Sequence, residues 1–181
     1  MFKLNVDNLK HIYDVCAGHV EKGSSYRPIA QCVQLIVENG VCTATAVNGL
    51  SLGQTRVSVY ITEGETVDEG TYLIPVVKIP KTLIPCTIEN TDTEMIIDFG
   101  SVKFCEKKPS GEFIDWKRCL EMKPKEPKYA ICVNPRLLIN SLNSLKGETF
   151  VKIIFGEPTA PFFIESKSGN ENTLVLPARG W

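Results

Sequence analysis

The sequence predicts an α+β fold in which antiparallel sheets carry helices packed on one face. Three observations support this. Two stretches have apolar residues at helical spacing, several others alternate apolar and polar residues as strands do, and tight Asn-Gly turns separate neighbouring strands. With 181 residues, 43% of them hydrophobic, the chain is long enough to bury a core without a metal ion or disulfide.

The first third of the chain is expected to form a helix followed by three strands, led by a short strand at residues 2–6. The helix runs from Asp7, its expected cap, to about Val20, and Gly23-Ser24-Ser25 ends it. Its buried face consists of Leu9, Ile12, Cys16 and Val20. The strands are expected at residues 29–37, 41–47 and 54–61, with turns at Asn39-Gly40 and Asn48-Gly49.

The remaining two thirds repeat parts of this pattern. The acidic stretch 62–70 is predicted to be a solvated loop, and the two prolines within residues 78–85 leave little room for a helix. Asn134-Pro135 opens a second helix with Leu138, Leu142 and Leu145 on its buried face, and Gly147 ends it. Strands are predicted at residues 72–77, 86–90, 94–99, 101–105, 129–133, 150–155, 162–166 and 173–176.

This order of elements indicates three versions of one unit: a strand, a helix or its remnant, and three strands. The three units are residues 1–61, 71–105 and 129–177. Polar residues with spaced prolines make 121–128 the best linker in the chain. The predicted organisation is therefore a domain at 1–120, a linker at 121–128 and a half-sized module at 129–181.

Composition limits the classes of function. Twenty basic against 21 acidic residues exclude a uniformly basic protein that coats nucleic acid, but they permit a basic stripe on one face. Neither a signal peptide nor an apolar run long enough to span a membrane is visible. The seven cysteines are odd in number and never form C-x-x-C, which is typical of reduced core thiols in a cytoplasmic protein.

The sequence gives little support for an enzyme. His11, Cys16 and His19 lie on one expected helix, where a Cys-His nucleophile or a metal site is conceivable. No second cluster of ligands has matching spacing, and the common catalytic and phosphate-binding motifs are absent from the sequence. We therefore expect a protein without catalytic activity, metal or cofactor.

Five segments stand out, namely Ser24-Ser25-Tyr26-Arg27-Pro28-Ile29-Ala30, Thr45-Ala46-Val47-Asn48-Gly49-Leu50-Ser51-Leu52, Gly111-Glu112-Phe113-Ile114-Asp115-Trp116-Lys117-Arg118-Cys119-Leu120, Val133-Asn134-Pro135-Arg136-Leu137-Leu138-Ile139-Asn140-Ser141-Leu142 and Leu174-Val175-Leu176-Pro177-Ala178-Arg179. In that order they resemble S-R-P-I-L, A-T-D-G-H-R-L, G-R-F-P-D-Y-R-R-V-L, F-N-P-x-Y-L-L-D-A-L and V-V-M-P-M-R-L of bacterial replicative sliding clamps, the DNA polymerase III beta subunits. Family members have three domains of two units each. This chain resembles a middle domain followed by the second half of the last domain.

The resemblance implies a clamp-like fold and a pocket for short linear peptides of partner proteins. One wall of this pocket would consist of Ala30, Val47, Gly49, Leu50, Ser51 and Leu52. The other wall would consist of Leu174, Leu176, Pro177, Ala178 and Arg179. The alternative for Leu174 and Leu176 is that they are core residues of a terminal strand.

The resemblance also implies a helical inner wall that contacts DNA phosphates without reading bases. The cations that would do so are Lys10, His11, Lys22, Arg27, Arg136 and Lys146; the alternative is that they are ordinary surface charges. The expected function is a non-enzymatic sliding-clamp-like processivity factor of DNA replication, with DNA polymerase or other clamp-binding proteins as partners. The alternative is a monomeric peptide-binding module that does not encircle DNA. A ring of twelve units would need about four chains, and a monomer or dimer is the expected state.

Overall fold

The computed structural model divides the chain into two compact units, Met1–Met122 and Lys123–Trp181. Of the predicted linker 121–128, only Glu121 is among the described residues, and it ends a helix. The structure describes residues 1–23, 27–63, 66–81, 84–121, 130–145, 147–167, 169 and 171–178.

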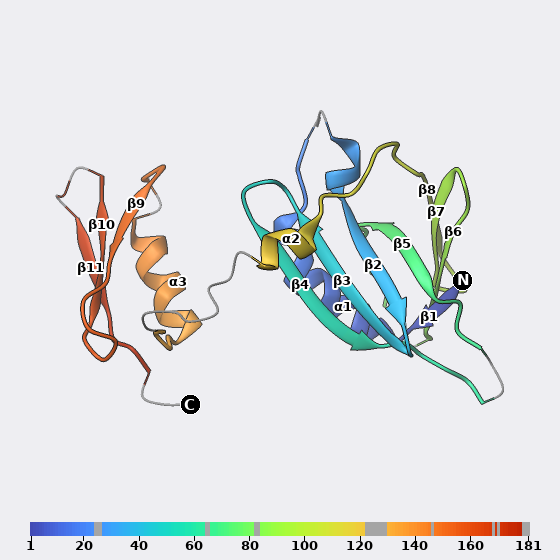
Figure 1. Ribbon diagram of the computed structural model, residues 1–181, viewed down its shortest axis with the longest axis horizontal. Helices are drawn as coiled ribbons and strands as arrows, with labels where there is room; N and C mark the ends of the chain where they lie inside the picture. Colours follow the sequence, from blue (N-terminus) through green and yellow to red (C-terminus); the bar gives the residue numbers. More distant parts are fainter. Residues whose placement is uncertain are drawn as a thin grey trace. The chain divides into compact units, whose positions relative to one another are not determined.

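The first unit contains two four-stranded antiparallel sheets (Figure 1). One sheet has the order β4-β3-β2-β5 and the other the order β1-β6-β7-β8. The strands are β1 (Phe2–Leu4), β2 (Cys32–Glu38), β3 (Val41–Val47), β4 (Leu52–Ser58), β5 (Gly70–Pro75), β6 (Cys86–Asn90), β7 (Glu94–Asp98) and β8 (Lys103–Lys107). The helices are α1 (Val6–Cys16) and α2 (Trp116–Glu121), with 3₁₀ turns η1 (Ala17–His19) and η2 (Pro28–Gln31).

The two repeats of the first unit exchange their leading strands. The strand β1, which begins the first repeat, pairs with β6 of the second repeat, in the register Phe2–Ile88. The strand β5, which begins the second repeat, pairs with β2 of the first, in the register Val33–Ile74. Each repeat therefore completes the sheet of the other, and neither sheet of this unit is made by one repeat alone.

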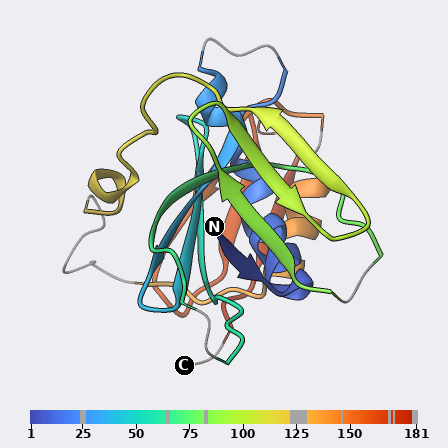
Figure 2. The same ribbon diagram turned by 90° about the vertical axis from the view of Figure 1, so that its right-hand side faces the viewer.

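The main core of the first unit lies where α1 meets both sheets. Leu9, Ile12 and Cys16 of α1 are fully buried, as the apolar spacing predicts. They belong to one cluster with Val33 of β2 and Ile88 of β6. Figure 2 shows the β1-β6-β7-β8 sheet, coloured green to yellow apart from the blue β1, with α1 in blue beside it.

A glycine allows α1 and β4 to approach closely. A Cβ built on Gly53 would lie 2.6 Å from the carbonyl oxygen of Val15 and would also collide with the ring of His19. The carbonyl oxygen of Gly53 in turn accepts a hydrogen bond from the Cys16 thiol at 3.6 Å. Only glycine fits at this position without a shift of the helix away from the sheet.

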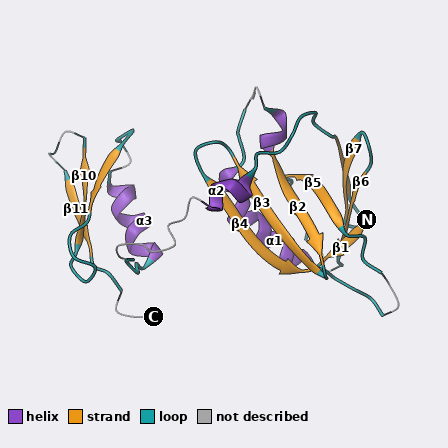
Figure 3. Cartoon of the chain, in the orientation of Figure 1, coloured by secondary structure: helices purple, strands orange, loops and turns teal. Residues whose placement is uncertain are grey.

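The second unit has one helix on one face of a three-stranded antiparallel sheet (Figure 3). The sheet order is β11-β10-β9. The core consists of Leu145, Phe162, Ile164 and Val175. The elements are α3 (Pro135–Ser144), β9 (Val151–Ile154), β10 (Phe162–Ser166) and β11 (Asn172–Val175).

Several predicted boundaries differ from the structure. The first helix begins at Val6 instead of Asp7, ends at Cys16, and continues only as the 3₁₀ turn to His19, because the chain must turn toward η2. Asp7 is not its cap; its carboxylate pairs with Lys10 in the first turn. Residues 29–31 are in η2 instead of a strand. Of the predicted stop, Ser24 and Ser25 lie outside the described residues.

The last third also departs from the prediction in two places. Among the described residues of the predicted strand 129–133, only Val133 forms a β-bridge, to Pro177. Leu142 of α3 is 37% exposed, although the helical spacing placed it on the buried face. Outside the last third, the helix α2 was not predicted from the sequence.

All seven cysteines are free thiols, of which four are buried, two are exposed and Cys132 is half-buried. Cys16, Cys32, Cys42 and Cys86 are buried as predicted. The prediction of core thiols is wrong for Cys105 and Cys119, which are exposed because β8 is an edge strand and α2 buries none of its residues. No helix within the described part of the chain is both long enough and apolar enough to cross a membrane.

Candidate peptide-binding site

Two of the predicted pocket residues, Ala30 and Val47, line one hollow of about 340 Å³ in the first unit. Both side chains are nearly inaccessible, with 2% and 4% of their surface exposed. The wall of this hollow, which we call the Ala30–Val47 hollow, is formed by Arg27, Pro28, Ile29, Ala30, Val47, Ser110, Gly111, Glu112, Phe113 and Ile114.

The alternation of β3 explains why Val47 reaches this hollow. Cys42, Ala44 and Ala46 belong to the main core beside α1, so Val47 lies on the opposite face of the sheet. Val47 is nevertheless buried, since residues 110–114 line the same hollow.

The start of α2 and the segment before it are each held against the first unit by one contact. The indole Nε1 of Trp116 donates a hydrogen bond of 2.8 Å to Oε1 of Gln34 on β2. The side chain of Phe113 packs against the small cluster of Ile29, Cys32, Leu73 and Met95. Sequence reasoning did not assign Phe113 and Ile114 to the pocket, although both lie in the segment 111–120 that carries one of the resemblances.

Of the other predicted residues of this wall, Gly49, Leu50 and Ser51 lie in the loop between β3 and β4, and Leu52 is the first residue of β4. The Asn48 Oδ1 atom accepts hydrogen bonds from the backbone N–H groups of Leu50 and Ser51, at 3.0 and 2.9 Å. Gly49 has φ +82°, a conformation that favours glycine. Nδ1 of His19 lies 2.8 Å from Oγ of Ser51. This loop presents the apolar side chain of Leu50, three residues after Val47, with 97% of its surface exposed.

The predicted second wall belongs to the second unit. Leu174 and Leu176 are 48% and 61% exposed, while Val175 between them is buried in the core. The two leucines are thus not core residues, and the alternation of a strand places them on the face away from the core. Leu52 of the first wall and Pro177 of the second are half-buried, Gly49, Ser51 and Ala178 are exposed, and Arg179 lies outside the described residues.

Comparison with solved structures places this arrangement in a known fold. The DNA polymerase sliding clamp from Bacillus subtilis matches 97% of this chain with a TM-score of 0.76 and 19% identity. The DNA polymerase III beta chain from Streptococcus pneumoniae matches 98% with a TM-score of 0.78 and 17% identity. A third clamp, from Pseudomonas aeruginosa, matches 99% with a TM-score of 0.75 and 12% identity. The chain has the sliding-clamp fold.

The chain spans about half the length of these clamps, between 48% and 52%. No protein-family model matches the sequence, and no curated protein sequence matches it. The resemblance that the sequence motifs indicated is therefore confirmed at the level of fold.

The cations expected at a DNA-contacting wall of a clamp lie on several elements. Lys10 and His11 are exposed on α1, Lys22 follows η1, and Arg136 is in the first turn of α3. Arg27 lines the Ala30–Val47 hollow, and Lys146 lies outside the described residues. Lys10 pairs with Asp7 at 3.0 Å, and Asp14 is exposed on the same helix. This balance leaves α1 without an excess of positive charge.

The three residues of the conceivable Cys-His site have separate partners. The His11 Nε2 atom lies 3.1 Å from Thr55 Oγ1, and the His19 ring contacts Ser51. The thiol of Cys16 is buried, and desolvation raises its pKa to about 11, which opposes formation of a nucleophilic thiolate. The described residues contain no group of three or more His, Cys, Asp or Glu side chains arranged to hold a metal ion.

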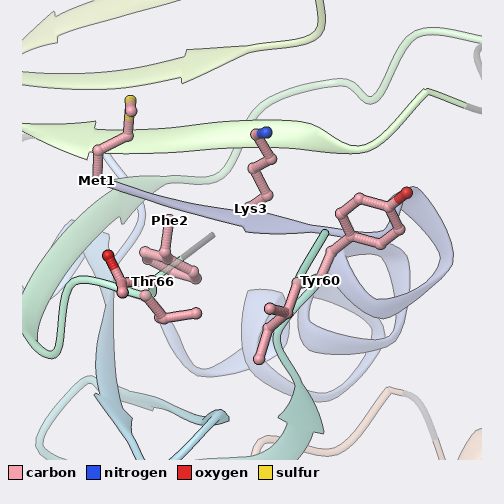
Figure 4. Close-up of a pocket in the computed structure, with 7 residues that line it drawn as sticks. Met1, Phe2, Lys3, Tyr60 and Thr66 are labelled. Atoms are coloured by element: carbon pink, nitrogen blue, oxygen red, sulfur yellow. The ribbon is translucent and has the colours of Figure 1, made fainter. Parts of the chain in front are cut away.

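Another hollow, of about 340 Å³, lies beside β1 (Figure 4). Met1, Phe2, Lys3, Tyr60 and Thr66 line it, together with Ile61 and Val67. The backbone N–H of Tyr60 donates to the Lys3 carbonyl at 2.8 Å, so the hollow marks the place where the chain after β4 returns to β1. None of the predicted site residues lines it.

Proposed function

We propose that this protein is a non-enzymatic sliding-clamp-like factor of DNA replication that binds short linear peptides of a DNA polymerase or of other clamp-binding proteins. The sliding-clamp fold over nearly the whole chain is the observation that carries this proposal. Solved structures to which the chain is similar carry the name DNA polymerase sliding clamp.

The Ala30–Val47 hollow supports peptide binding as the activity. It is concave, its walls combine aliphatic and aromatic side chains with Arg27, and it suits a peptide with apolar anchors. Leu50 adds an almost fully exposed apolar side chain at the nearby loop, and Leu174 and Leu176 add a second apolar strip on β11 and its extension. We propose that each strip contacts a partner peptide through its exposed apolar side chains.

The experiment is fluorescence polarisation with a labelled peptide that contains one aliphatic and one aromatic anchor. We expect Leu50→Asp and Leu176→Asp each to weaken binding at least tenfold, because a carboxylate in an apolar contact remains unpaired. Both side chains are more than half exposed, so the substitutions should leave the fold intact.

Val102→Asp is the matched control for both variants. Val102 is also an exposed apolar residue, 41% accessible, but it precedes β8 and is not among the residues that line the Ala30–Val47 hollow. Binding by this variant should equal that of the unmodified protein. Unchanged affinity in both the Leu50 and Leu176 variants would refute the proposed pocket.

The second candidate function is a peptide-binding module that does not encircle DNA. The charge balance of α1 favours it, since Asp7 and Asp14 offset Lys10. Retention on circular against linear DNA separates the two functions. A closed ring stays on circles and slides off linear ends, whereas a module without a ring is retained on neither.

A further inference from the structure

The second unit repeats the beginning of the first unit residue by residue. Residues 131–135 take the places of residues 2–6, with Asn134 and Asn5 at the same position as N-caps of α3 and α1. Along the helices, Leu138 then corresponds to Leu9 and Leu145 to Cys16. The second unit is thus one repeat: a leading segment, a helix and a three-stranded sheet.

The leading segment has the same backbone contact in both units. In the first unit, the N–H of Tyr60, just after β4, donates to the carbonyl of Lys3 at 2.8 Å. In the second unit, the N–H of Ala178, just after β11, donates to the carbonyl of Cys132 at 2.8 Å. Residues 131–133 are therefore held where β1 is held, with one edge bound to their own repeat.

The second unit differs in what covers this repeat. In the first unit β1 adds to β6, and β5 adds to β2. In the second unit β9 pairs only with β10, so its other edge has no strand among the described residues. The leading segment likewise has no strand on its outer edge within the part of the chain that the structure describes. An open strand edge readily pairs with another chain.

The side chains at this surface are more exposed than their counterparts. Tyr13 of α1 is 9% exposed and donates a hydrogen bond to the carbonyl of Pro75, on the leading strand of the other repeat. Leu142, which takes the place of Tyr13, is 37% exposed. Ile153 lies opposite Ile164 as Ile88 lies opposite Ile97, yet Ile153 is 42% exposed and Ile88 is fully buried.

These side chains surround an apolar hollow of about 410 Å³. Its wall consists of Ile131, Val133, Leu138, Ile153, Phe155 and Phe162, and none of these residues is charged. The hollow lies on the face where, in the first unit, the second repeat packs against the first. We call this surface, together with the open edge of β9, the half-domain face.

We propose that the half-domain face binds the half-domain face of a second copy of this chain. The second unit carries both complementary pieces, an open leading segment and an open β9 edge, so two copies related by a two-fold axis satisfy both pairs at once. Residues 131–133 of each copy add to β9 of the other, as β1 adds to β6 and β5 adds to β2. The product is a complete domain of two repeats, made by two chains.

The register of this pairing follows from the first unit. Because Phe2 lies opposite Ile88 and Lys3 opposite Thr87, Ile131 lies opposite Ile153 of the partner subunit, and Cys132 lies opposite Lys152 of the partner subunit. The dimer contains six repeats, and two such dimers contain the twelve repeats of a ring. The proposal concerns the second unit only, so it can fail while peptide binding at the Ala30–Val47 hollow stands.

The first experiment is sedimentation equilibrium of the full chain between 1 and 100 μM. We expect a dimer or an even-numbered assembly, and we expect Ile153→Asp to lower the association constant at least a hundredfold. Phe163→Asp is the matched control, since Phe163 is 44% exposed but lies on β10 between the core residues Phe162 and Ile164, on the other face of the sheet. The proposal is overturned if the chain is monomeric at 100 μM, or if the Ile153→Asp and Phe163→Asp variants associate equally strongly.

The second experiment tests the same pairing by disulfide trapping and does not depend on the folding of the Ile153→Asp variant. Lys152→Cys is introduced in a chain that carries Cys105→Ser and Cys119→Ser, and the thiols are oxidised. The side chain of Lys152 is 73% exposed, so its loss is tolerated. Directly opposed residues of antiparallel strands are close enough for a disulfide, and we expect a dimer through Cys132 that reduction dissolves. Asn172→Cys, on the β11 edge, is the control; equal yields of dimer from the two variants refute the proposed register and edge.

Discussion

Four thiols lie in the interior of the first unit, in surroundings that disfavour a charge. Desolvation raises the pKa of Cys16, Cys32 and Cys86 to about 11, and that of Cys42 to about 12. Below the ordinary thiol pKa of about 8.5 these groups are neutral in both the folded and the unfolded chain. Above it, only the unfolded chain loses protons, so the stability conferred by the neutral thiols is lost as pH rises toward 11.

We therefore predict that the free energy of unfolding falls between pH 8.5 and pH 11. Each buried thiol contributes a loss of at most about 1.4 kcal/mol per pH unit, and less where the unfolded chain retains some structure. Urea denaturation at pH 7.5 and pH 10 measures the difference.

Cys42→Ala should reduce this pH dependence, since it removes one titrating group, although it also lowers stability at every pH by leaving a small cavity. Cys119→Ser is the control, because it also removes a cysteine, but one that is exposed and lies outside the core. An identical fall between pH 7.5 and pH 10 in the Cys42 variant and in the unmodified protein would contradict the assignment.

Some residues of the candidate site were named from the sequence, and others were not. Ala30 and Val47, which belong to two segments that resemble clamp motifs, line the same hollow. The difference between Val47 and Leu50 could not be predicted, since Val47 at the end of β3 is almost fully buried and Leu50, three residues later, is almost fully exposed. That difference depends on residues 110–114, which are distant in sequence and line the hollow.

The helices α3 and α1 differ in the hydrogen bonding of their N-cap side chains. The Oδ1 atom of Asn134 accepts a hydrogen bond of 3.0 Å from the backbone N–H of Arg136. Asn5 occupies the same position before α1, but its side chain makes no capping hydrogen bond. We predict that Asn134→Ala destabilises the second unit by about 1 kcal/mol, since the N–H of Arg136 loses its partner.

Amide hydrogen exchange of α3 measures this prediction, and Asn5→Ala with exchange of α1 is the matched control. The same substitution at Asn5 should change protection of α1 by less than half as much, because no capping bond is removed. Equal losses of protection in the two helices would mean that the Asn134 bond contributes nothing specific.

Element boundaries were predictable where a local signal fixes the backbone. Asn39-Gly40 forms the hairpin turn between β2 and β3, with φ values of +51° and +74°. Other errors arose from contacts that are distant in sequence. The helix α2 is only six residues long and has no buried residues of its own, so its sequence carries no helical pattern of apolar residues. The partners of β1 and β5 were not predictable either, because the exchange of leading strands is a property of two repeats together.

At the scale of the whole molecule, the two units have separate cores. The first includes residues from α1 and from both sheets, whereas the second consists of Leu145, Phe162, Ile164 and Val175. A chain with two independent cores unfolds in more than one step. We predict two transitions on thermal unfolding, of which the lower belongs to the second unit. Its core is smaller, and within the described residues no strand pairs with the outer edge of its leading segment or of β9.

Two substitutions assign the transitions by calorimetry. Leu145→Ala removes a side chain of the second unit that is 4% exposed. It should lower the midpoint temperature of the lower transition only, by the equivalent of about 2–4 kcal/mol. Ile12→Ala removes a fully buried side chain of α1 and should lower the midpoint temperature of the upper transition only. If a second copy covers the half-domain face, the lower transition also rises with protein concentration while the upper one does not, since association stabilises only the folded unit that takes part in it. A single transition shifted by both substitutions would show instead that the units unfold together, and their cores would then have to be treated as one.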